Sequence, residues 1–241
     1  PLSDPAAFQS LHEPLKSSES RRRWEIRFSP KLFQETVKDY YRLLFGVDRE
    51  IGRMRDELER QGAEENTVII FTSDHGFYLG ERGLAGKWFA HEESIRIPLL
   101  IHDPRNPGKR KQPLTELVLN IDLAPTILKA CGLPVPPSMK GIDLRDREAL
   151  AKRNAVFGAS YAHDIFDVAQ PTLSVQTRYV VTGDWKLLLH HGGQVPGKSA
   201  ELYNLSNDPA EEADLASKHA DKVRELSAQL AAWWPGPKAA P

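Results

Sequence analysis

The stretch from Asp39 to Thr72 constrains the fold of this chain most. Apolar residues recur three or four positions apart between Asp39 and Gln61, and Gly62 follows as a stop signal. This spacing predicts an amphipathic helix of about six turns. The run Thr67–Thr72 is apolar and rich in β-branched residues, so it predicts a short strand buried on both faces. A helix, a short turn and a buried strand make half of an α/β unit.

The alternation continues further along the chain. Ile97–Ile101 is a second short apolar run, and Asp122–Cys131 has the pattern of a helix. Cys131 ends an apolar segment beside Gly132, and we expect its side chain in the core. The fold class predicted for this part is α/β, with the later strands of a mixed or parallel sheet between flanking helices.

After residue 138 the pattern changes to short strand-like runs. They favour antiparallel pairing, because turn residues such as the Gly-Asp pair at 183–184 separate them. The predicted strands are Arg178–Thr182, Trp185–Leu189 and Glu201–Leu205. The final segment Ser217–Trp234 has one apolar stripe. A small antiparallel sheet with one packed helix is therefore expected at the end of the chain.

Three regions follow from these patterns. Residues 1–35 are rich in Pro, Ser and charge and are predicted to be a connector or peripheral segment. Residues 36–150 form the α/β part, and residues 151–241 form a small α+β subdomain. The arginine run at 21–23 could grip an anion, but a solvated surface is the favoured interpretation.

Composition excludes several classes of partner. The 32 Lys and Arg nearly cancel the 33 Asp and Glu, which leaves a formal net charge of −1 and gives no field toward nucleic acid or anionic membranes. No apolar run approaches the roughly 18 to 20 residues of a membrane span, and the sequence does not open with a signal peptide. Cys131 is the only cysteine, so neither an internal disulfide nor a thiolate metal cage can form within this chain.

The residues that carry chemistry begin directly after the predicted strand Thr67–Thr72. Asp74 and His75 can offer an oxygen and a nitrogen to one divalent cation, and Gly76 allows a sharp turn beside them. Ligands gather at the carboxyl ends of strands in open α/β sheets, which supports this interpretation. In the alternative, Asp74 caps the next segment and His75 is simply exposed.

Lys87 is a candidate for binding an anion. Its ammonium supplies a charge and three donors to sulfate or phosphate oxygens, and Gly80, Gly83 and Gly86 would let the loop fold back over the metal ligands. The alternative is an ordinary surface lysine. His91 is a candidate substrate contact, although His91 and the two glutamates after it also fit the first turn of a short helix, which is the favoured interpretation.

Taken together, these motifs resemble the carboxy-terminal signature of the formylglycine-dependent sulfatases, in the alkaline phosphatase superfamily. The resemblance covers most of residues 40–216. Its first part comprises Ser-Asp-His-Gly at 73–76, Leu-Gly-Glu at 79–81, Gly-Lys at 86–87 and Glu92–Leu99. Further matching stretches are Asn120–Thr126, Gly132–Pro134, Met139–Gly141 and Glu201–Pro209. The combination is more specific than Ser-Asp-His-Gly alone, which recurs across the superfamily.

The resemblance implies an alkaline-phosphatase-like sandwich and the hydrolysis of sulfuric esters. Asp74 and His75 would bind a metal, with Ca²⁺ the usual ion, and Lys87 would bind the sulfate and the leaving-group oxygen. The substrate would be a sulfated small molecule or glycan. The resemblance also favours a periplasmic or extracellular location.

The chain departs from the family in one large respect. It lacks the Cys/Ser-x-Pro-x-Arg segment that becomes formylglycine, so the nucleophile is expected in a missing N-terminal part, and this chain alone is expected to be inactive. His75 stands where many sulfatases have Asn. The Asp-His pair found here also occurs in phosphonate monoester hydrolases. Phosphodiester or phosphonate monoester hydrolysis with Mn²⁺ or Zn²⁺ is therefore the alternative function, and a non-catalytic remnant is the third.

Overall fold

A computed structural model describes residues 5–105, 113–161, 176–191 and 198–234 of the 241-residue chain. The described residues fall into two compact units. The first contains residues 5–105, and the second contains residues 113–160, 176–191 and 199–234. Of the helices that the structure describes, none combines the length and the apolar character that crossing a bilayer requires.

The first unit begins with three short helices, which lie in the region predicted to be a connector or peripheral segment. These are α1 (Pro5–Ser10), α2 (Glu13–Lys16) and α3 (Glu19–Arg27). Ser18 is the N-cap of α3, because its side chain accepts a hydrogen bond from the N–H of Arg21. The arginine run lies on α3 and makes internal contacts: Arg22 and Arg23 both bind the buried carboxylate of Glu19.

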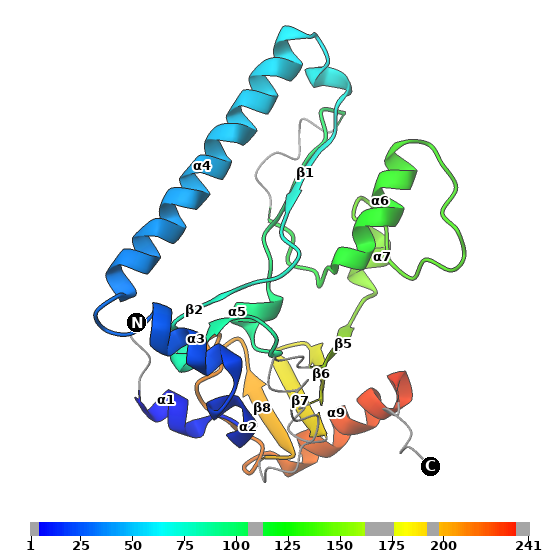
Figure 1. Ribbon diagram of the computed structural model, residues 1–241. Coiled ribbons are helices and arrows are strands. Elements are labelled where there is room, and N and C mark those ends of the chain that lie inside the picture. Colours follow the sequence, from blue (N-terminus) through cyan, green and yellow to red (C-terminus); the bar gives the residue numbers. More distant parts are fainter. Residues whose placement is uncertain (1–4, 106–112, 162–175, 192–197, 235–241) are drawn as a thin grey trace, which may run out of the picture. The chain divides into compact units, whose positions relative to one another are not determined.

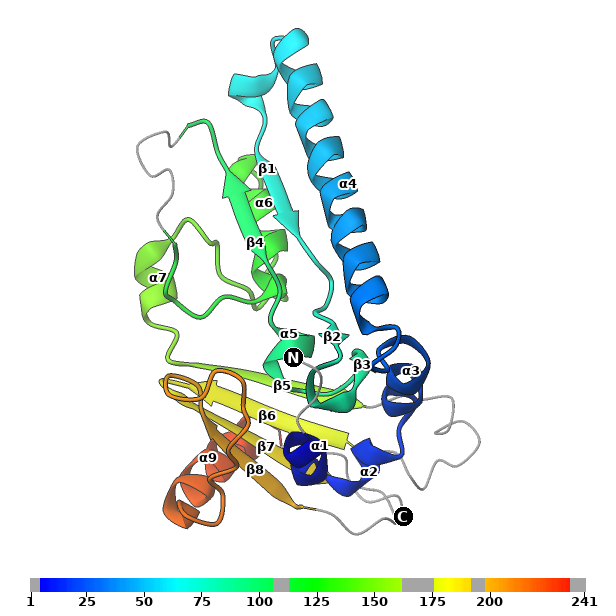
Figure 2. The same cartoon turned by 90° about the vertical axis from the view of Figure 1, so that its left-hand side faces the viewer.

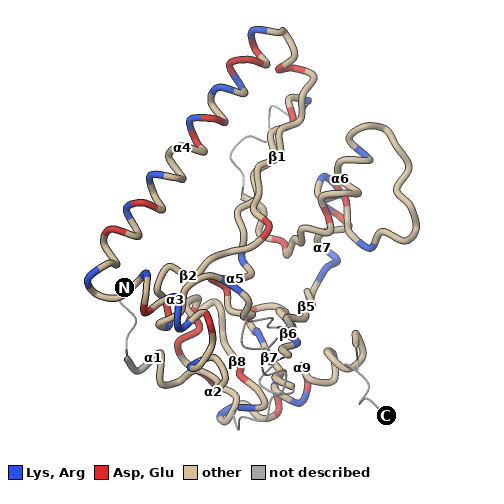
Figure 3. Tube along the Cα trace, viewed as in Figure 1, with Lys and Arg blue, Asp and Glu red and all other residues tan. Residues whose placement is uncertain are grey.

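The long helix α4 (Phe33–Arg60) confirms the predicted amphipathic helix and begins six residues earlier than expected. Figure 3 shows acidic and basic residues interspersed along it. One of the ion pairs on this helix joins Arg53 to Glu50 at 2.8 Å. None of its residues is buried, and Leu43 is 72% exposed. Gly62 follows with φ of +65°, and the short helix η1 (Glu64–Asn66) leads into the first strand (Figure 1).

Strand β1 (Ile69–Thr72) pairs antiparallel with β4 (Leu99–His102), as Figure 2 shows. The prediction that this strand is buried on both faces was wrong, because all four of its residues are half-buried. Among the described residues, β4 is its one partner strand, and Leu100 on β4 is 60% exposed. The apolar faces of these strands are therefore only partly covered.

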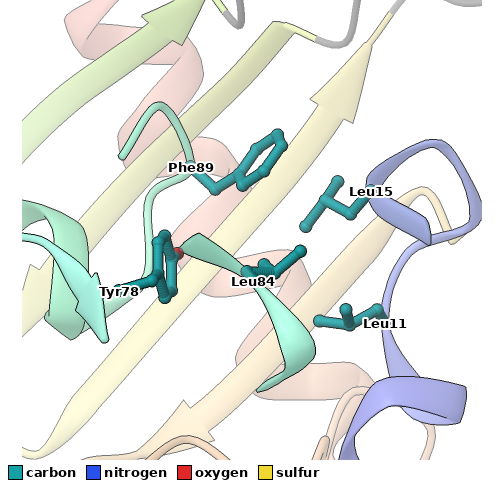
Figure 4. Packing of buried hydrophobic residues seen from close by; sticks show 5 residues of the cluster. All are labelled: Leu11, Leu15, Tyr78, Leu84 and Phe89. Atoms are coloured by element: carbon teal, nitrogen blue, oxygen red, sulfur yellow. The ribbon is translucent and has the colours of Figure 1, made fainter. Parts of the chain in front are cut away.

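A tight hairpin follows β1 in the chain. Strand β2 (Tyr78–Leu79) pairs antiparallel with β3 (Ala85–Gly86), and the short helix η2 (Glu81–Gly83) connects them. Helix α5 (Glu92–Ile95) comes next. The core of this unit joins the hairpin to the first two helices through five buried side chains, which Figure 4 shows: Leu11, Leu15, Tyr78, Leu84 and Phe89.

The second unit contains the predicted small sheet. The strand order is β5-β6-β7-β8, and β6 to β8 pair antiparallel as expected. The strands are β5 (Ala155–Tyr161), β6 (Gln176–Thr182), β7 (Trp185–His191) and β8 (Ala200–Asn204). Helix α9 (Ala220–Trp233) covers one face, where Leu226 and Leu230 pack on Val180, Leu187 and Leu202.

Three short helices precede this sheet in the chain: η4 (Asn120–Asp122), α6 (Leu123–Ala130) and α7 (Arg147–Ala151). Helix α6 confirms the helix predicted from Asp122. The expectation that Cys131 lies in the core was wrong, because its thiol group is exposed. Cys131 caps the carboxyl end of α6, where Gly132 reverses the chain with φ of +72°, so the end of the apolar segment faces outward.

Candidate functional site

The candidate metal ligands lie where the sequence places them, directly after β1. Ser73 follows the strand, and its hydroxyl donates to the carbonyl of His75 at 2.8 Å, which closes a turn around Asp74. Thr72, the last residue of β1, donates its hydroxyl to the carbonyl of Pro98 at 2.9 Å. The turn is thus fixed at its base, while the Asp74 side chain is 85% exposed and that of His75 is 33% exposed.

Gly76 is required by a close approach of two backbones. Its N–H donates to the carbonyl of Ser94 at 2.7 Å, and a Cβ built on Gly76 would lie 2.2 Å from the carbonyl oxygen of Glu93. The obstructing atom is main chain in helix α5, so it cannot swing aside as a side chain would. Glycine at position 76 therefore allows the backbone directly after His75 to lie against α5.

We expect Gly76→Ala to lower the free energy of unfolding by about 1 to 3 kcal/mol, because the added methyl group must push two backbone segments apart. Urea unfolding followed by circular dichroism measures the change. Gly52→Ala is the matched control, since nothing lies within 4 Å of a Cβ at Gly52 on α4. This control should raise stability by about 0.5 to 1 kcal/mol. Equal effects of the two substitutions would contradict the close approach.

The surroundings of the His75 ring fix which nitrogen can bind a metal. Nδ1 lies 2.7 Å from the carbonyl oxygen of Gly76, and because a carbonyl only accepts, Nδ1 carries the proton. Nε2 then holds the free lone pair. The carboxylate oxygen Oδ1 of Asp74 is 3.5 Å from Nε2. An oxygen and a nitrogen donor thus lie together on the same side of the ring.

The structure also brings Lys87 to this point, twelve residues after His75. The ammonium Nζ of Lys87 makes a short contact with Nε2 of His75. The hairpin returns the chain through three glycines that have positive φ: Gly80, Gly83 and Gly86, with values of +113°, +68° and +98°. Three of the four predicted site residues, Asp74, His75 and Lys87, are therefore neighbours.

These residues fit part of a metal site. Within the described ranges no group of three or more His, Cys, Asp and Glu side chains could hold an ion, so Asp74 and His75 supply two donors only. Ca²⁺ takes six to eight oxygen ligands and Zn²⁺ about four mixed ones, so either ion needs further donors. The lone pair on Nε2 serves one partner at a time, so a metal there would replace the contact with Lys87.

His91 lies in a different environment. Its side chain is 1% exposed, and its Nδ1 is 2.8 Å from the hydroxyl of Tyr78. It is the N-cap residue of α5, so this stretch does begin a short helix. Glu93 in that helix accepts a hydrogen bond from Arg82 at 3.3 Å. A role of His91 in binding substrate stays a prediction.

The sequence did not predict the residues of α3 that bind the β2–β3 hairpin. Ser20 on α3 is fully buried; its hydroxyl donates to the carbonyl of Ala85 at 2.7 Å and accepts from the N–H of the same residue at 3.2 Å. A helical apolar spacing of three and four residues in this region did indicate a packed segment: Phe8, Leu11 and Leu15. The polar composition of residues 1–35 outweighed that short pattern.

Comparison with known proteins agrees with these motifs. Residues 5–133 match the sulfatase family, and residues 80–233 match the family described as N-sulphoglucosamine sulphohydrolase, C-terminal. An N-acetylglucosamine-6-O-sulfatase of Bacteroides thetaiotaomicron is 35% identical over 199 residues, which are 80% of this chain and 35% of that protein.

Two solved structures are similar in fold. One, described as a complex with its substrate D-glucosamine-2-N,6-O-disulfate, has a TM-score of 0.65 and 29% identity, over 83% of this chain and 40% of that one. A phosphonate monoester hydrolase of Agrobacterium radiobacter has a TM-score of 0.70 and 24% identity, over 85% of this chain and 42% of that one. This chain thus spans between 35% and 42% of the length of these relatives.

Proposed function

Because this chain belongs to the sulfatase family, we propose that it forms the carboxy-terminal part of a sulfuric ester hydrolase and carries metal-binding and sulfate-binding residues of that enzyme. The observation that carries the proposal is the contact of Lys87 with His75 beside Asp74, at the carboxyl end of β1. An ammonium next to two metal donors suits a substrate that is an anion.

Each residue has a defined role in this proposal. Asp74 and His75 hold a divalent cation, His75 through Nε2. When bound, the cation polarises the ester and offsets negative charge. Lys87 binds the sulfate oxygens and stabilises charge that develops on the leaving-group oxygen. Ca²⁺ is the proposed ion, since a carboxylate is a hard ligand, and Mn²⁺ or Zn²⁺ are the alternatives that an imidazole ligand would suit.

The substrate class that we propose is a sulfated sugar or other sulfated small molecule. Two relatives support it, since one is named for a 6-O-sulfated aminosugar and the other is described with a disulfated glucosamine. The proposed location, periplasmic or extracellular, follows from the family alone.

The partner that we propose is the N-terminal part of the same polypeptide. It would supply the nucleophile, because Cys131 sits in the sequence Ala-Cys-Gly-Leu-Pro without a following arginine. It would also cover the exposed apolar side chains of α4 and β4, among them Leu43 at 72% and Leu100 at 60% exposure. Apolar residues on a long helix and a sheet pair normally face a packed layer.

Phosphonate monoester hydrolysis is the second candidate. The imidazole of His75 favours it, because a nitrogen ligand suits Mn²⁺ or Zn²⁺ better than Ca²⁺. The fold that the chain shares with a phosphonate monoester hydrolase is compatible with either reaction.

The test compares three substrates on the full-length enzyme that contains this chain: an aryl sulfate, an aryl phosphonate monoester and a phosphodiester. We expect the aryl sulfate to have the highest kcat/KM. Asp74→Ala should lower this value at least about 10²-fold, because a metal ligand is lost. Asp221→Ala is the matched control, since the Asp221 side chain is 91% exposed on α9. Preference for the phosphonate ester would establish the second candidate instead.

Metal titration by calorimetry gives an independent measure in the same protein. Asp74→Ala should weaken divalent cation binding about 10-fold or more, whereas Asp221→Ala should not change it. Residues 1–241 alone should turn over none of the three substrates. Turnover by the isolated chain that disappears in Asp74→Ala would show that the site is complete without an N-terminal part.

A further inference from the structure

Lys87 sits between two residues with unusual backbone conformations. Gly86 has φ of +98°, and Trp88 has φ of +99°. Glycine adopts such values freely, but a tryptophan with its Cβ does so rarely, and residues held this way are concentrated at functional sites. Both neighbours of Lys87 thus have positive φ, and a specific set of contacts must hold Trp88 in this conformation.

Gly86 and Arg23 both contact the Trp88 ring. The ring lies close to Gly86, where an added Cβ would be 3.0 Å from the ring atom Cζ3. The guanidinium carbon of Arg23 lies 4.7 Å from the ring centroid, within the range of a cation–π contact. Residue 86 must therefore be glycine for two reasons: its φ is positive, and the Trp88 ring lies where a Cβ would need space.

Arg23 is itself fixed by a buried carboxylate. Its Nε donates to Glu19 at 3.0 Å, and Glu19 is 3% exposed. Hydrogen bonds from Arg22 first, and from Arg23, hold the pKa of Glu19 below its ordinary value, although burial opposes them. The guanidinium of Arg23 thus contacts both the Glu19 carboxylate on α3 and the Trp88 ring.

Helix α3 also forms hydrogen bonds with the β2–β3 hairpin at two further residues. Ser20 binds both the N–H and the carbonyl of Ala85, and Arg21 donates to the carbonyl of Gly83 at 3.3 Å. Helix α3 therefore contacts the chain before Lys87 through Ser20 and after Lys87 through Arg23.

We propose that Arg23 and Trp88 are positioning residues for Lys87: their stack holds the positive-φ backbone on either side of Lys87 and so keeps its ammonium beside His75 and Asp74. This inference rests on the proposed role of Lys87 in binding sulfate. It gives α3 a supporting role beside the active site, through Arg23.

A double-mutant cycle in the full-length enzyme tests this proposal. Arg23→Gln removes the cation over the ring, and Trp88→Gly removes the ring. We expect kcat/KM for an aryl sulfate to fall about 10-fold and about 10²-fold, respectively, because a displacement of about 1 Å is costly at a catalytic group. In a Lys87→Ala background, both substitutions should lower kcat/KM by less than about 2-fold, since no ammonium remains to be positioned.

Arg22→Gln is the matched control. Arg22 lies on the same helix and binds the same Glu19 carboxylate, but the guanidinium over Trp88 belongs to Arg23. It should change kcat/KM by less than about 2-fold. The inhibition constant of inorganic sulfate gives a binding readout: it should rise with Arg23→Gln in the Lys87 enzyme and stay constant in the Lys87→Ala background.

The outcomes separate this proposal from the proposed function. Equal losses in the Lys87 and Lys87→Ala backgrounds, or an equal loss with Arg22→Gln, would overturn the positioning role while leaving Lys87 in the mechanism. A normal rate for Lys87→Ala alone would instead remove Lys87 from the mechanism. If Trp88→Gly does not fold, Arg23→Gln, which changes a partly exposed side chain, carries the cycle by itself.

Discussion

In the full-length enzyme, Lys87→Ala is expected to lower the rate of aryl sulfate cleavage at least about 10²-fold, which is the usual cost of losing one donor that stabilises developing charge. The ammonium of Lys87 contacts Nε2 of His75 beside the carboxylate of Asp74, so it lies next to both proposed metal ligands. The loss should appear mainly in kcat if the contact with the leaving-group oxygen strengthens in the transition state.

Two further variants sharpen this expectation. Lys87→Arg keeps the charge but replaces a compact ammonium with a planar fork, so we expect a rate between those of the parent enzyme and Lys87→Ala. Lys152→Ala is the control, because Lys152 is 73% exposed and pairs only with the exposed Glu148 among the contacts described for it. A rate for Lys87→Ala within about 3-fold of that of Lys152→Ala would exclude Lys87 from the reaction.

The sequence predicted this neighbourhood because the signals are local. A strand followed by Asp74 and His75 puts both residues at one end of β1, and three glycines let the hairpin return Lys87 to them. The contribution of α3 could not be predicted in the same way. The contacts of Ser20 with Ala85, and of Arg23 with Trp88, join residues 65 positions apart, and no short-range period records such a pairing.

Burial was the least predictable property of the fold. The apolar run of β1 predicted a strand covered on both faces, but burial depends on neighbouring layers, and in the described residues β1 has one partner strand. Strand β5 was missed for a different reason. It contains Gly158, which lowers strand propensity, and the reason for that glycine lies in Tyr179, whose ring atoms would be 2.2 Å from an added Cβ.

The family motif Asn120–Thr126 shows that a recognisable motif can be structural. Asp122 is fully buried, and both of its oxygens bind the guanidinium of Arg153, at 2.6 and 2.7 Å. The N–H groups of Leu119 and Ile142 also donate to it, each at 2.8 Å. The carboxylate of Asp122 therefore links η4 to Arg153, two residues after the end of α7, and to the chain at Ile142.

Asp122→Ala is expected to lower the free energy of unfolding of the second unit by about 3 to 5 kcal/mol, since it leaves a guanidinium that is only 10% exposed without its buried counter-charge. Two backbone N–H groups lose their acceptor as well. Urea unfolding at pH 7 measures the effect. Glu148→Ala provides the control, because the pair of Glu148 with Lys152 is exposed and should contribute about 0.5 kcal/mol or less.

The cost of Asp122→Ala should also depend on pH. Burial raises the pKa of Asp122, but the hydrogen bonds from Arg153 and two backbone N–H groups outweigh it, so the folded pKa lies below the ordinary value of 3.8. A lowered carboxylate pKa stabilises the fold above the unfolded pKa, and this contribution is lost as the pH falls through the folded pKa. The difference in unfolding free energy between the parent protein and Asp122→Ala should therefore be constant from pH 7 to about 5 and shrink below about pH 4. A difference that is unchanged at pH 3, or one that grows there, would show that the ionised carboxylate is not what stabilises this unit.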